Sequence, residues 1–264
     1  MLFLSLQFYL CLQIVCMEQP LFSIITITFN AEKELPATLD SVRCQSFRNF
    51  EYLVIDGKSN DSTVGLAKES GIKGILIVSE PDNGLYDAMN KGIRKAKGRY
   101  LIFLNAGDAF HSPDSLSEIA VAAEANGFPD VVYGQTQLVD ASRKFVAMRH
   151  LSAPEHLTFE SFRQGMLVCH QAFVVKREIA EPYDLRYRFS ADYEWCLRCL
   201  KKMKGSAYTG TVIIDYLTDG LTDKNHMASL KERFRIMCDY YGVLPTIVRH
   251  IGFFFRNLCR KLLS

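Results

Sequence analysis

The stretch SIITITFNAEKELPATLDSVRCQSFRNFEYLVIDGKSNDST, residues 23–63, decides the fold class of this chain. Its first run is rich in isoleucine and threonine, which predicts a buried strand over 23–28. Leu35, Leu39 and Val42 then recur at spacings of four and three, and Pro36 suits a first helical turn, which predicts a helix up to about Gln45. A second apolar run at 51–55 predicts another strand, followed by a polar loop that opens a helix. This order of strand, helix and strand is typical of a parallel sheet.

The same alternation continues over the next eighty residues or so. Apolar runs predict strands at 75–78, 100–104 and 130–133, and helical spacing predicts helices at 86–97 and 115–125. The chain is therefore expected to form an α/β fold, with a mostly parallel central sheet flanked by helices. Beyond about residue 135 the pattern weakens, and residues 141–181 give only short apolar runs such as 172–175. The remaining predicted elements are a helix at 192–203, a strand at 212–214 and a helical C-terminal region in two pieces, separated near Gly242 and Pro245.

The composition excludes several classes of protein. The 264 residues are 48% hydrophobic and 23% charged, which excludes intrinsic disorder and is enough to bury one core. The longest apolar run, residues 1–16, contains Gln7 and Gln13 and is shorter than the roughly 20 residues of a membrane-spanning helix. The eight cysteines lie among apolar neighbours, so we expect reduced thiols, and we expect Cys196 and Cys199 to serve packing rather than zinc binding.

Polar residues follow the predicted strands directly. Ligands of an open parallel sheet bind beyond the carboxyl ends of its strands, so these residues are candidates for a binding site. Each residue alone is also compatible with a helix cap or a turn. Together they favour a site at one edge of the sheet: Asn30, Asp56, Asp61, Asp82 and Asp108.

The kind of ligand follows from the motifs that are present and absent. No GxGxxG follows the first strand and no GxxxxGK[ST] occurs, which disfavours a dinucleotide site and a P-loop. A carboxylate at the end of a buried strand with a second oxygen donor nearby favours Mg²⁺ or Mn²⁺ bridging to substrate phosphates. The segment Asn105-Ala106-Gly107-Asp108 fits that description.

Four stretches resemble the inverting family 2 glycosyltransferases with a GT-A fold, of the kind found in bacterial surface polysaccharide biosynthesis. They are residues 23–63 quoted above, SEPDNGLYDAMNKGIRKAKGRYLIFLNAGD at 79–108, Cys169-His170-Gln171, and FSADYEWCLR at 189–198. The resemblance covers roughly residues 20–223. It implies a GT-A sheet flanked by helices with a C-terminal helical extension.

The resemblance assigns roles to individual residues. It implies that Asp108 holds the metal ion, although the usual DxD motif has an amide here at Asn105, which lowers the charge of the predicted metal site by one. Lys91 is a further candidate for contact with the ribose and diphosphate. Asp219–Thr222 resembles a loop that closes over the diphosphate. The residues implied in nucleotide binding are Thr28, Asn30, Glu32, Asp56, Ser59, Asp61, Asp82, Gly84, Asp87, Asn90 and Asn105.

The same resemblance implies the catalytic and acceptor residues. Asp192 matches the carboxylate that deprotonates the acceptor hydroxyl, and Glu194 is the second candidate. The alternative for Asp192 is a helix cap followed by a core tryptophan. His170, Gln171 and Trp195 are expected at the sugar or acceptor, with metal positioning or packing as the alternatives for the histidine and glutamine.

The expected reaction moves a sugar from a nucleoside-diphosphate sugar to a hydroxyl of a lipid-linked glycan acceptor, with polyprenyl diphosphate as the expected carrier. Mg²⁺ or Mn²⁺ would stabilise the charge on the departing diphosphate. One alternative is a sugar nucleotidyltransferase, but its Gly-rich basic loop is missing after the first strand. The other is a catalytically idle sugar-nucleotide binder, for which the amide at Asn105 is the support.

The expected organisation has three parts. Residues 1–16 are an apolar leader, an extra helix or an artefact of start-site assignment, and 17–223 form the catalytic domain. Residues 224–264 contain 8 Lys+Arg against 2 Asp+Glu and predict a basic amphipathic tail. Such a tail favours either contact with the inner face of the cell membrane or packing on the protein, and nothing else indicates nucleic acid binding. Its apolar stripe is Ile247, Ile251, Phe254, Leu258 and Leu262.

Overall fold

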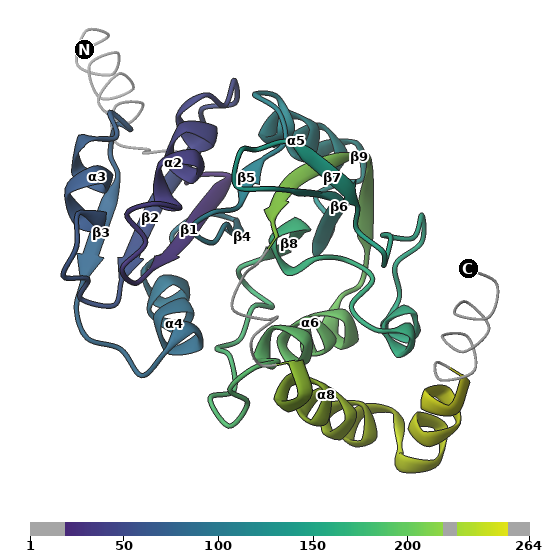
Figure 1. The fold of residues 1–264 in the computed structure, drawn as a ribbon. Helices are drawn as coiled ribbons and strands as arrows, with labels where there is room; N and C mark the ends of the chain where they lie inside the picture. Colours follow the sequence, from purple (N-terminus) through teal and green to yellow (C-terminus); the bar gives the residue numbers. More distant parts are fainter. Residues whose placement is uncertain (1–18, 219–225, 253–264) are drawn as a thin grey trace, which may run out of the picture.

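The computed structural model describes residues 19–218 and 226–252 of the chain. A nine-stranded sheet runs through the molecule in the order β3-β2-β1-β4-β8-β6-β9-β5, with β7 paired to β6. Helices lie on both sides of this sheet (Figure 1). None of the helices in the described ranges is both long and apolar enough to cross a membrane.

The N-terminal half of the sheet is parallel. Strand β1 (Phe22–Thr28) lies between β2 (Phe50–Asp56) and β4 (Tyr100–Phe103), and β3 (Leu76–Ser79) pairs with β2. In Figure 1, α2 (Leu35–Arg43) and α3 (Thr63–Glu69) lie on one side of these strands and α4 (Leu85–Lys95) on the other. These strands and helices confirm the sequence prediction to within two residues at most ends.

The C-terminal half of the sheet is mixed. Strand β8 (Phe173–Lys176) is antiparallel to both β4 and β6 (Val131–Val139), whereas β9 (Ser206–Leu217) is parallel to β6. Helix α5 (Ser115–Ala125) agrees with the prediction at both ends. The mixed sheet with flanking helices confirms the fold class, but parallel pairing dominates only on the N-terminal side. The short strands β5 (Ala109–Phe110) and β7 (Phe145–Met148) were not predicted.

The C-terminal helices pack on the rest of the protein. Helix α6 (Ala191–Lys202) contacts α8 (His226–Tyr241), which buries Ile236 and Met237. Gly242 has a φ of 88°, which ends α8, and a further helix covers residues 243–252. The predicted break near Gly242 is confirmed. The second half of the predicted stripe, Phe254, Leu258 and Leu262, lies outside the described residues.

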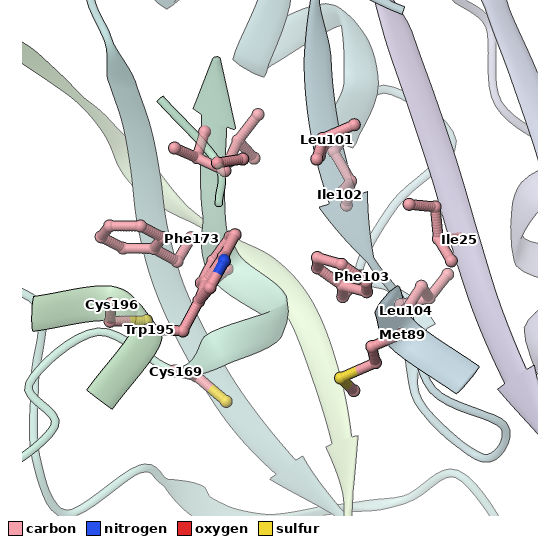
Figure 2. Packing of buried hydrophobic residues seen from close by; sticks show 14 of the residues in the cluster. Ile25, Met89, Leu101, Ile102, Phe103, Leu104, Cys169, Phe173, Trp195 and Cys196 are labelled. Atoms are coloured by element: carbon pink, nitrogen blue, oxygen red, sulfur yellow. The ribbon is translucent and has the colours of Figure 1, made fainter. Parts of the chain in front are cut away.

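The core is centred on β1 and β4, both fully buried. A side chain at Gly92 would approach Ile25 Cγ2 to 2.6 Å, so only glycine lets α4 lie this close to the sheet. In Figure 2, Trp195 lies between Phe173 and Phe103 in the same core. The described cysteines are free thiols. Cys169, Cys196 and Cys199 are buried, whereas Cys44 is exposed and Cys238 is partly buried.

Candidate active site

Asp56, at the carboxyl end of β2, is the most strongly hydrogen-bonded carboxylate of the site. Its buried side chain accepts bonds from Thr28 Oγ1 at 3.0 Å and Ser79 Oγ at 2.6 Å. It also accepts bonds from the backbone N–H and the hydroxyl of Ser59. Burial raises the pKa of Asp56, but these donors outweigh it and hold the pKa below its ordinary value. Asp56 is therefore a fixed anionic acceptor at the sheet edge.

The loops after β1 and β2 are joined by side chain to backbone hydrogen bonds. The Asn30 N–H donates to Ser59 Oγ at 2.8 Å, and Asn30 Oδ1 accepts from the Asn60 N–H at 3.0 Å. Asp61 Oδ2 accepts from the Glu32 N–H at 3.2 Å. The predicted nucleotide residues Asn30, Glu32, Ser59 and Asp61 thus lie together. Many of their hydrogen-bonding groups are used to hold the two loops together.

Asp82 lies directly over the end of β2. A side chain at Gly57 would come within 2.6 Å of Asp82 Oδ2, so the glycine leaves room for this carboxylate beside Asp56. Asp82 Oδ1 accepts from the Gly84 N–H at 2.9 Å, and Gly84 has a φ of 109°. The ring of Phe29, which is mostly exposed, is also close to Gly57. Asp82 and Phe29 therefore both lie beside Gly57, next to Asp56.

Three residues of the α4 region hold local structure. Asp87 Oδ2 accepts from the Asn83 N–H at 3.0 Å, and Lys91 Nζ donates to the Pro81 carbonyl at 2.6 Å. Both polar groups of the Asn90 amide are bonded to the backbone of Tyr183. The structure therefore places Asn90 as a support for the segment around Tyr183 and not on a free surface for a nucleotide.

Asp108 is buried in the segment between β4 and β5. Its Oδ1 accepts from the Leu217 N–H at 3.0 Å and its Oδ2 from Gln171 Nε2 at 2.6 Å. Burial raises the pKa of Asp108 to about 7, although these hydrogen bonds and the charge of Arg143 oppose the shift. Gln171, expected at the sugar or acceptor, thus orients Asp108, and Cys169 Sγ donates to Gln171 Oε1 at 2.9 Å.

The residues around Asp108 offer a small set of oxygen donors for a divalent cation. Asn105 Oδ1 is buried and has no hydrogen-bond partner, so it is an oxygen atom free to accept a ligand. Within the described ranges no three His, Cys, Asp or Glu side chains gather at one metal site. A carboxylate and an amide oxygen are donor types that a divalent cation accepts when substrate phosphates and water supply its other ligands.

Asp192 occupies the first turn of α6. The Tyr86 hydroxyl donates to Asp192 Oδ1 at 3.2 Å, and the Tyr193 N–H donates to the same oxygen at 2.8 Å. Tyr86 belongs to the first turn of α4, two residues after Gly84. Asp56 is hydrogen-bonded to Ser79 at the end of β3, the chain continues from Ser79 to the start of α4, and Tyr86 in that turn donates to Asp192. A second path runs from Asp108 through Gln171 to its neighbour His170, which contacts Tyr183.

Glu194 faces the opposite way, which corrects its prediction as a second catalytic candidate. Both of its oxygens accept from Arg198 Nε, at 2.9 and 3.0 Å, and Tyr240 of α8 donates to Oε1 at 2.6 Å. The carboxylate is buried between α6 and α8. Its helical position, two residues after Asp192, explains the difference. Glu194 fastens α8 to α6.

His170 is a buried structural histidine, which corrects its prediction as a sugar or acceptor contact. Its Nε2 lies 2.6 Å from the Tyr183 hydroxyl, and its ring packs on Phe103 and Trp195. Burial lowers the pKa of His170 to about 4, against the charge of Asp192, so the ring is neutral at pH 7. Of the two alternatives for this histidine, metal positioning and packing, its contacts agree with packing.

Trp195 also lies in the core, which corrects its prediction as an acceptor contact. It is 0% exposed, stacks on Tyr183 at 4.9 Å between ring centroids, and donates from Nε1 to the Glu181 carbonyl at 2.6 Å. Figure 2 shows its indole between β8 and β4. The tryptophan therefore holds α6 on the sheet and places Asp192 indirectly.

Several residues of the site were not predicted. Tyr86 contacts Asp192, Ser79 donates to Asp56, and Thr38 Oγ1 bonds the backbone of Gly107 and Asp108. Tyr86 lies within the quoted stretch 79–108, so its position beside Gly84 was an available signal. Nothing in the local pattern around Thr38 distinguishes it from an ordinary buried threonine.

The sheet and its flanking helices define an α/β protein with a row of polar residues along one edge of the sheet. The sequence profile described as "Glycosyl transferase family 2" matches residues 23–183. The chain belongs to this family, and its fold is of the GT-A type. It is 31% identical to the PGL/p-HBAD biosynthesis glycosyltransferase of Mycobacterium bovis, over 83% of this chain and 88% of the relative. It is 29% identical to the amylovoran biosynthesis glycosyltransferase AmsB of Erwinia amylovora, over 68% and 64% of the two chains.

Solved structures support the same fold at low sequence identity. The crystal structure of S. aureus TarS 1-349 superposes with a TM-score of 0.69 at 14% identity, covering 88% of this chain and 72% of that chain. The same TarS fragment in complex with UDP-GlcNAc gives a TM-score of 0.68 at 15% identity, covering 88% and 73%. These similarities establish the fold. The sequence relatives establish a glycosyltransferase with homologues in polysaccharide biosynthesis.

Proposed function

We propose that the protein is an inverting glycosyltransferase that moves a sugar from a nucleoside-diphosphate sugar to a hydroxyl group of a glycan. The observation that carries this proposal is that Asp56 and Asp192 both accept hydrogen bonds from the short segment 79–86, through Ser79 and Tyr86. This supports one site with an anionic acceptor for the nucleotide and a carboxylate for the acceptor hydroxyl. Inversion follows from a single displacement, in which the incoming hydroxyl attacks opposite the departing diphosphate.

The donor is bound by residues at the ends of β1, β2 and β3. Asp56 accepts a hydrogen bond from the base, and the rim formed by Phe29 and Asp82 covers the ribose and the base. UDP is the first nucleotide to test, because the structurally similar TarS has been crystallised with UDP-GlcNAc and with UDP. Proteins of this family commonly use a divalent metal.

Asp192 deprotonates the acceptor hydroxyl. Tyr86 and the Tyr193 N–H hold its Oδ1, which leaves Oδ2 to accept the proton. Asn105 and Asp108 would hold Mg²⁺ or Mn²⁺, which supplies positive charge for the departing diphosphate. Gln171 keeps the Asp108 carboxylate in one orientation.

The proposed acceptor is a glycan linked to polyprenyl diphosphate, and the proposed place of action is the inner face of the cell membrane. The helix at 243–252 supports this part of the proposal, because its exposed face is apolar. Its exposed apolar residues are Val243, Leu244, Ile247, Val248 and Ile251.

The test compares donor binding with sugar transfer. Calorimetry with UDP, GDP and dTDP, with and without Mn²⁺, identifies the nucleotide, and transfer is then measured into membrane lipid extracts. Asp192→Asn should lower transfer by about 100-fold or more and leave nucleotide affinity within about twofold. A wild-type protein that binds a sugar nucleotide but transfers to no acceptor would favour the idle binder. Undiminished transfer by Asp192→Asn would refute the assignment of the base.

A further inference from the structure

The turn between β6 and β7 holds Arg143 in a defined backbone conformation. The Asp140 N–H donates to the Lys144 carbonyl at 3.0 Å, and Asp140 Oδ1 accepts from the N–H groups of Ser142 at 2.8 Å and Lys144 at 3.0 Å. The Arg143 N–H donates to the Asp140 carbonyl at 2.9 Å, and Arg143 has a φ of 62°. Few residues other than glycine adopt a positive φ. The turn is therefore organised around Asp140, which fixes where the arginine side chain begins.

Arg143 reaches across 36 positions of the sequence to the segment between β4 and β5. Its Nη1 donates to the Gly107 carbonyl at 2.6 Å. Its Nη2 lies 4.0 Å from Asp215 Oδ2 on β9, and Asp215 Oδ1 lies 2.8 Å from His111 Nδ1. The guanidinium group therefore has a carbonyl acceptor and a neighbouring carboxylate within the protein itself.

Gly107 is the residue through which this contact acts. It has a φ of 98°, and a side chain there would come within 2.9 Å of Leu217 Cδ2, so the position requires glycine. The Gly107 N–H donates to Thr38 Oγ1 at 2.9 Å. One bond from α2 and one from Arg143 thus hold the peptide groups before and after a residue that has the widest choice of backbone conformations.

Those peptide groups separate the two candidate ligands of the divalent cation. Asn105 precedes Gly107 by two residues, and Asp108 follows it directly. The Asp108 carboxylate is oriented by the Leu217 N–H and by Gln171. The distance between the Asn105 and Asp108 oxygens also depends on the backbone at Gly107, which those two donors do not hold.

We propose that Arg143 is a positioning residue for this metal site. By holding the Gly107 carbonyl it fixes the backbone that sets the Asn105 and Asp108 oxygens relative to each other. The proposal rests on the proposed function, in which these two residues hold Mg²⁺ or Mn²⁺. A guanidinium group repels a nearby cation, and the Asp215 carboxylate offsets that repulsion. Arg143 acts through Gly107 and contacts neither substrate nor metal.

The experiment compares Arg143→Asn and Arg143→Lys with Lys144→Asn. Asparagine tolerates a positive φ but is too short to reach Gly107, so Arg143→Asn removes the contact without straining the turn. Arg143→Lys keeps a charged donor, and Lys144→Asn changes an exposed residue of the same turn as the matched control. Melting curves establish that each variant is folded, and Arg143→Lys provides the comparison if Arg143→Asn is not.

The measurement separates nucleotide binding from metal binding. The full chain is titrated by calorimetry with whichever of UDP, GDP and dTDP the wild type binds, first with EDTA and then over a series of Mn²⁺ concentrations. In support of the proposal, Arg143→Asn keeps the wild-type nucleotide affinity in EDTA, because the Asp56 edge is unchanged. The Mn²⁺ concentration that gives half of the gain in nucleotide affinity rises about tenfold or more. It rises by less for Arg143→Lys and stays at the wild-type value for Lys144→Asn.

Three results overturn the proposal. A folded Arg143→Asn variant with the wild-type Mn²⁺ response would overturn the role of Arg143 and leave the proposed function standing. So would a variant that loses nucleotide affinity equally with EDTA and with Mn²⁺, since the arginine would then support the fold in general. A wild-type protein that binds no nucleoside diphosphate under either condition would overturn both the role of Arg143 and the proposed function.

Discussion

The Tyr86 hydroxyl donates a hydrogen bond to Asp192 Oδ1 at 3.2 Å across 106 positions of the sequence. This bond joins the first turn of α4, which follows Asp82 and Gly84, to the first turn of α6, which carries Asp192, the candidate base. Tyr86 also stacks on Tyr183, whose ring stacks on the buried Trp195. The position of the Asp192 carboxylate is therefore set by contacts from both α4 and α6.

Tyr86→Phe should slow transfer without weakening donor binding. The substitution removes one of the two donors that hold Asp192 Oδ1 but keeps the stacked ring. One such hydrogen bond to a charged group contributes about 1.5 kcal/mol, so we expect kcat to fall about tenfold while KM for the donor stays within about twofold. Steady-state kinetics with the identified sugar nucleotide measure both constants.

Tyr100→Phe is the matched control for this variant. Tyr100 is also buried, and its hydroxyl donates to the Pro129 carbonyl at 2.6 Å, on a contact that involves none of the candidate site residues. Its loss should lower thermal stability and leave kcat unchanged. Equal kcat values for Tyr86→Phe and Tyr100→Phe would mean that the bond to Asp192 does not orient the base.

Gln171→Ala should weaken the response to metal. Gln171 Nε2 donates to Asp108 Oδ2 at 2.6 Å, so without it the carboxylate loses a fixed orientation. Groups that orient a metal ligand typically change metal affinity by about 10- to 100-fold. We expect the Mn²⁺ concentration for half-maximal donor hydrolysis to rise at least tenfold. The exposed Gln164→Ala should behave as wild type, and an unchanged Mn²⁺ response for Gln171→Ala would contradict this role.

The sequence predicted the edge of the sheet well because local patterns determine it. The run at 23–28 and the polar residues after each strand indicated Asp56, Asp82 and Asp108 before any contact was known. His170 and Trp195 were placed wrongly because their burial depends on α6 packing over β4 and β8, which are far apart in the chain. The short strand β5 was missed for a similar reason, since it exists through its pairing with β9.

His170 should make the protein less stable as the pH falls. Its folded pKa of about 4 lies below the unfolded value of 6.5, because burial disfavours the charged ring. Between those values the unfolded chain binds more protons, so stability rises with pH and is lost as pH falls from about 6.5 toward 4. The loss attributable to His170 between pH 7 and pH 5 is about 2 kcal/mol. Urea unfolding over this range measures it.

His170→Gln isolates that contribution, because glutamine can still bond the Tyr183 hydroxyl but does not titrate. At pH 7 the variant should be less stable than the wild type, since its side chain packs less well on Phe103. At pH 5 the difference in free energy of unfolding between the variant and the wild type should be about 2 kcal/mol smaller than at pH 7. His156→Gln, at an exposed position, is the control and should keep the wild-type pH dependence. A constant difference between His170→Gln and wild type would show that His170 is not the titrating group.

The helix at 243–252 should bind anionic membranes through its exposed apolar face. Leu244 and Val248 are 76% and 68% exposed and lie one turn apart. Replacing both with glutamate removes apolar area and adds negative charge, so binding to vesicles of phosphatidylglycerol and phosphatidylcholine should fall at least tenfold in a sedimentation assay. Val121→Glu on α5, 65% exposed in the wild type, should leave vesicle binding unchanged. Equal vesicle binding by the double variant and the wild type would instead favour a role for this face in contacts with protein.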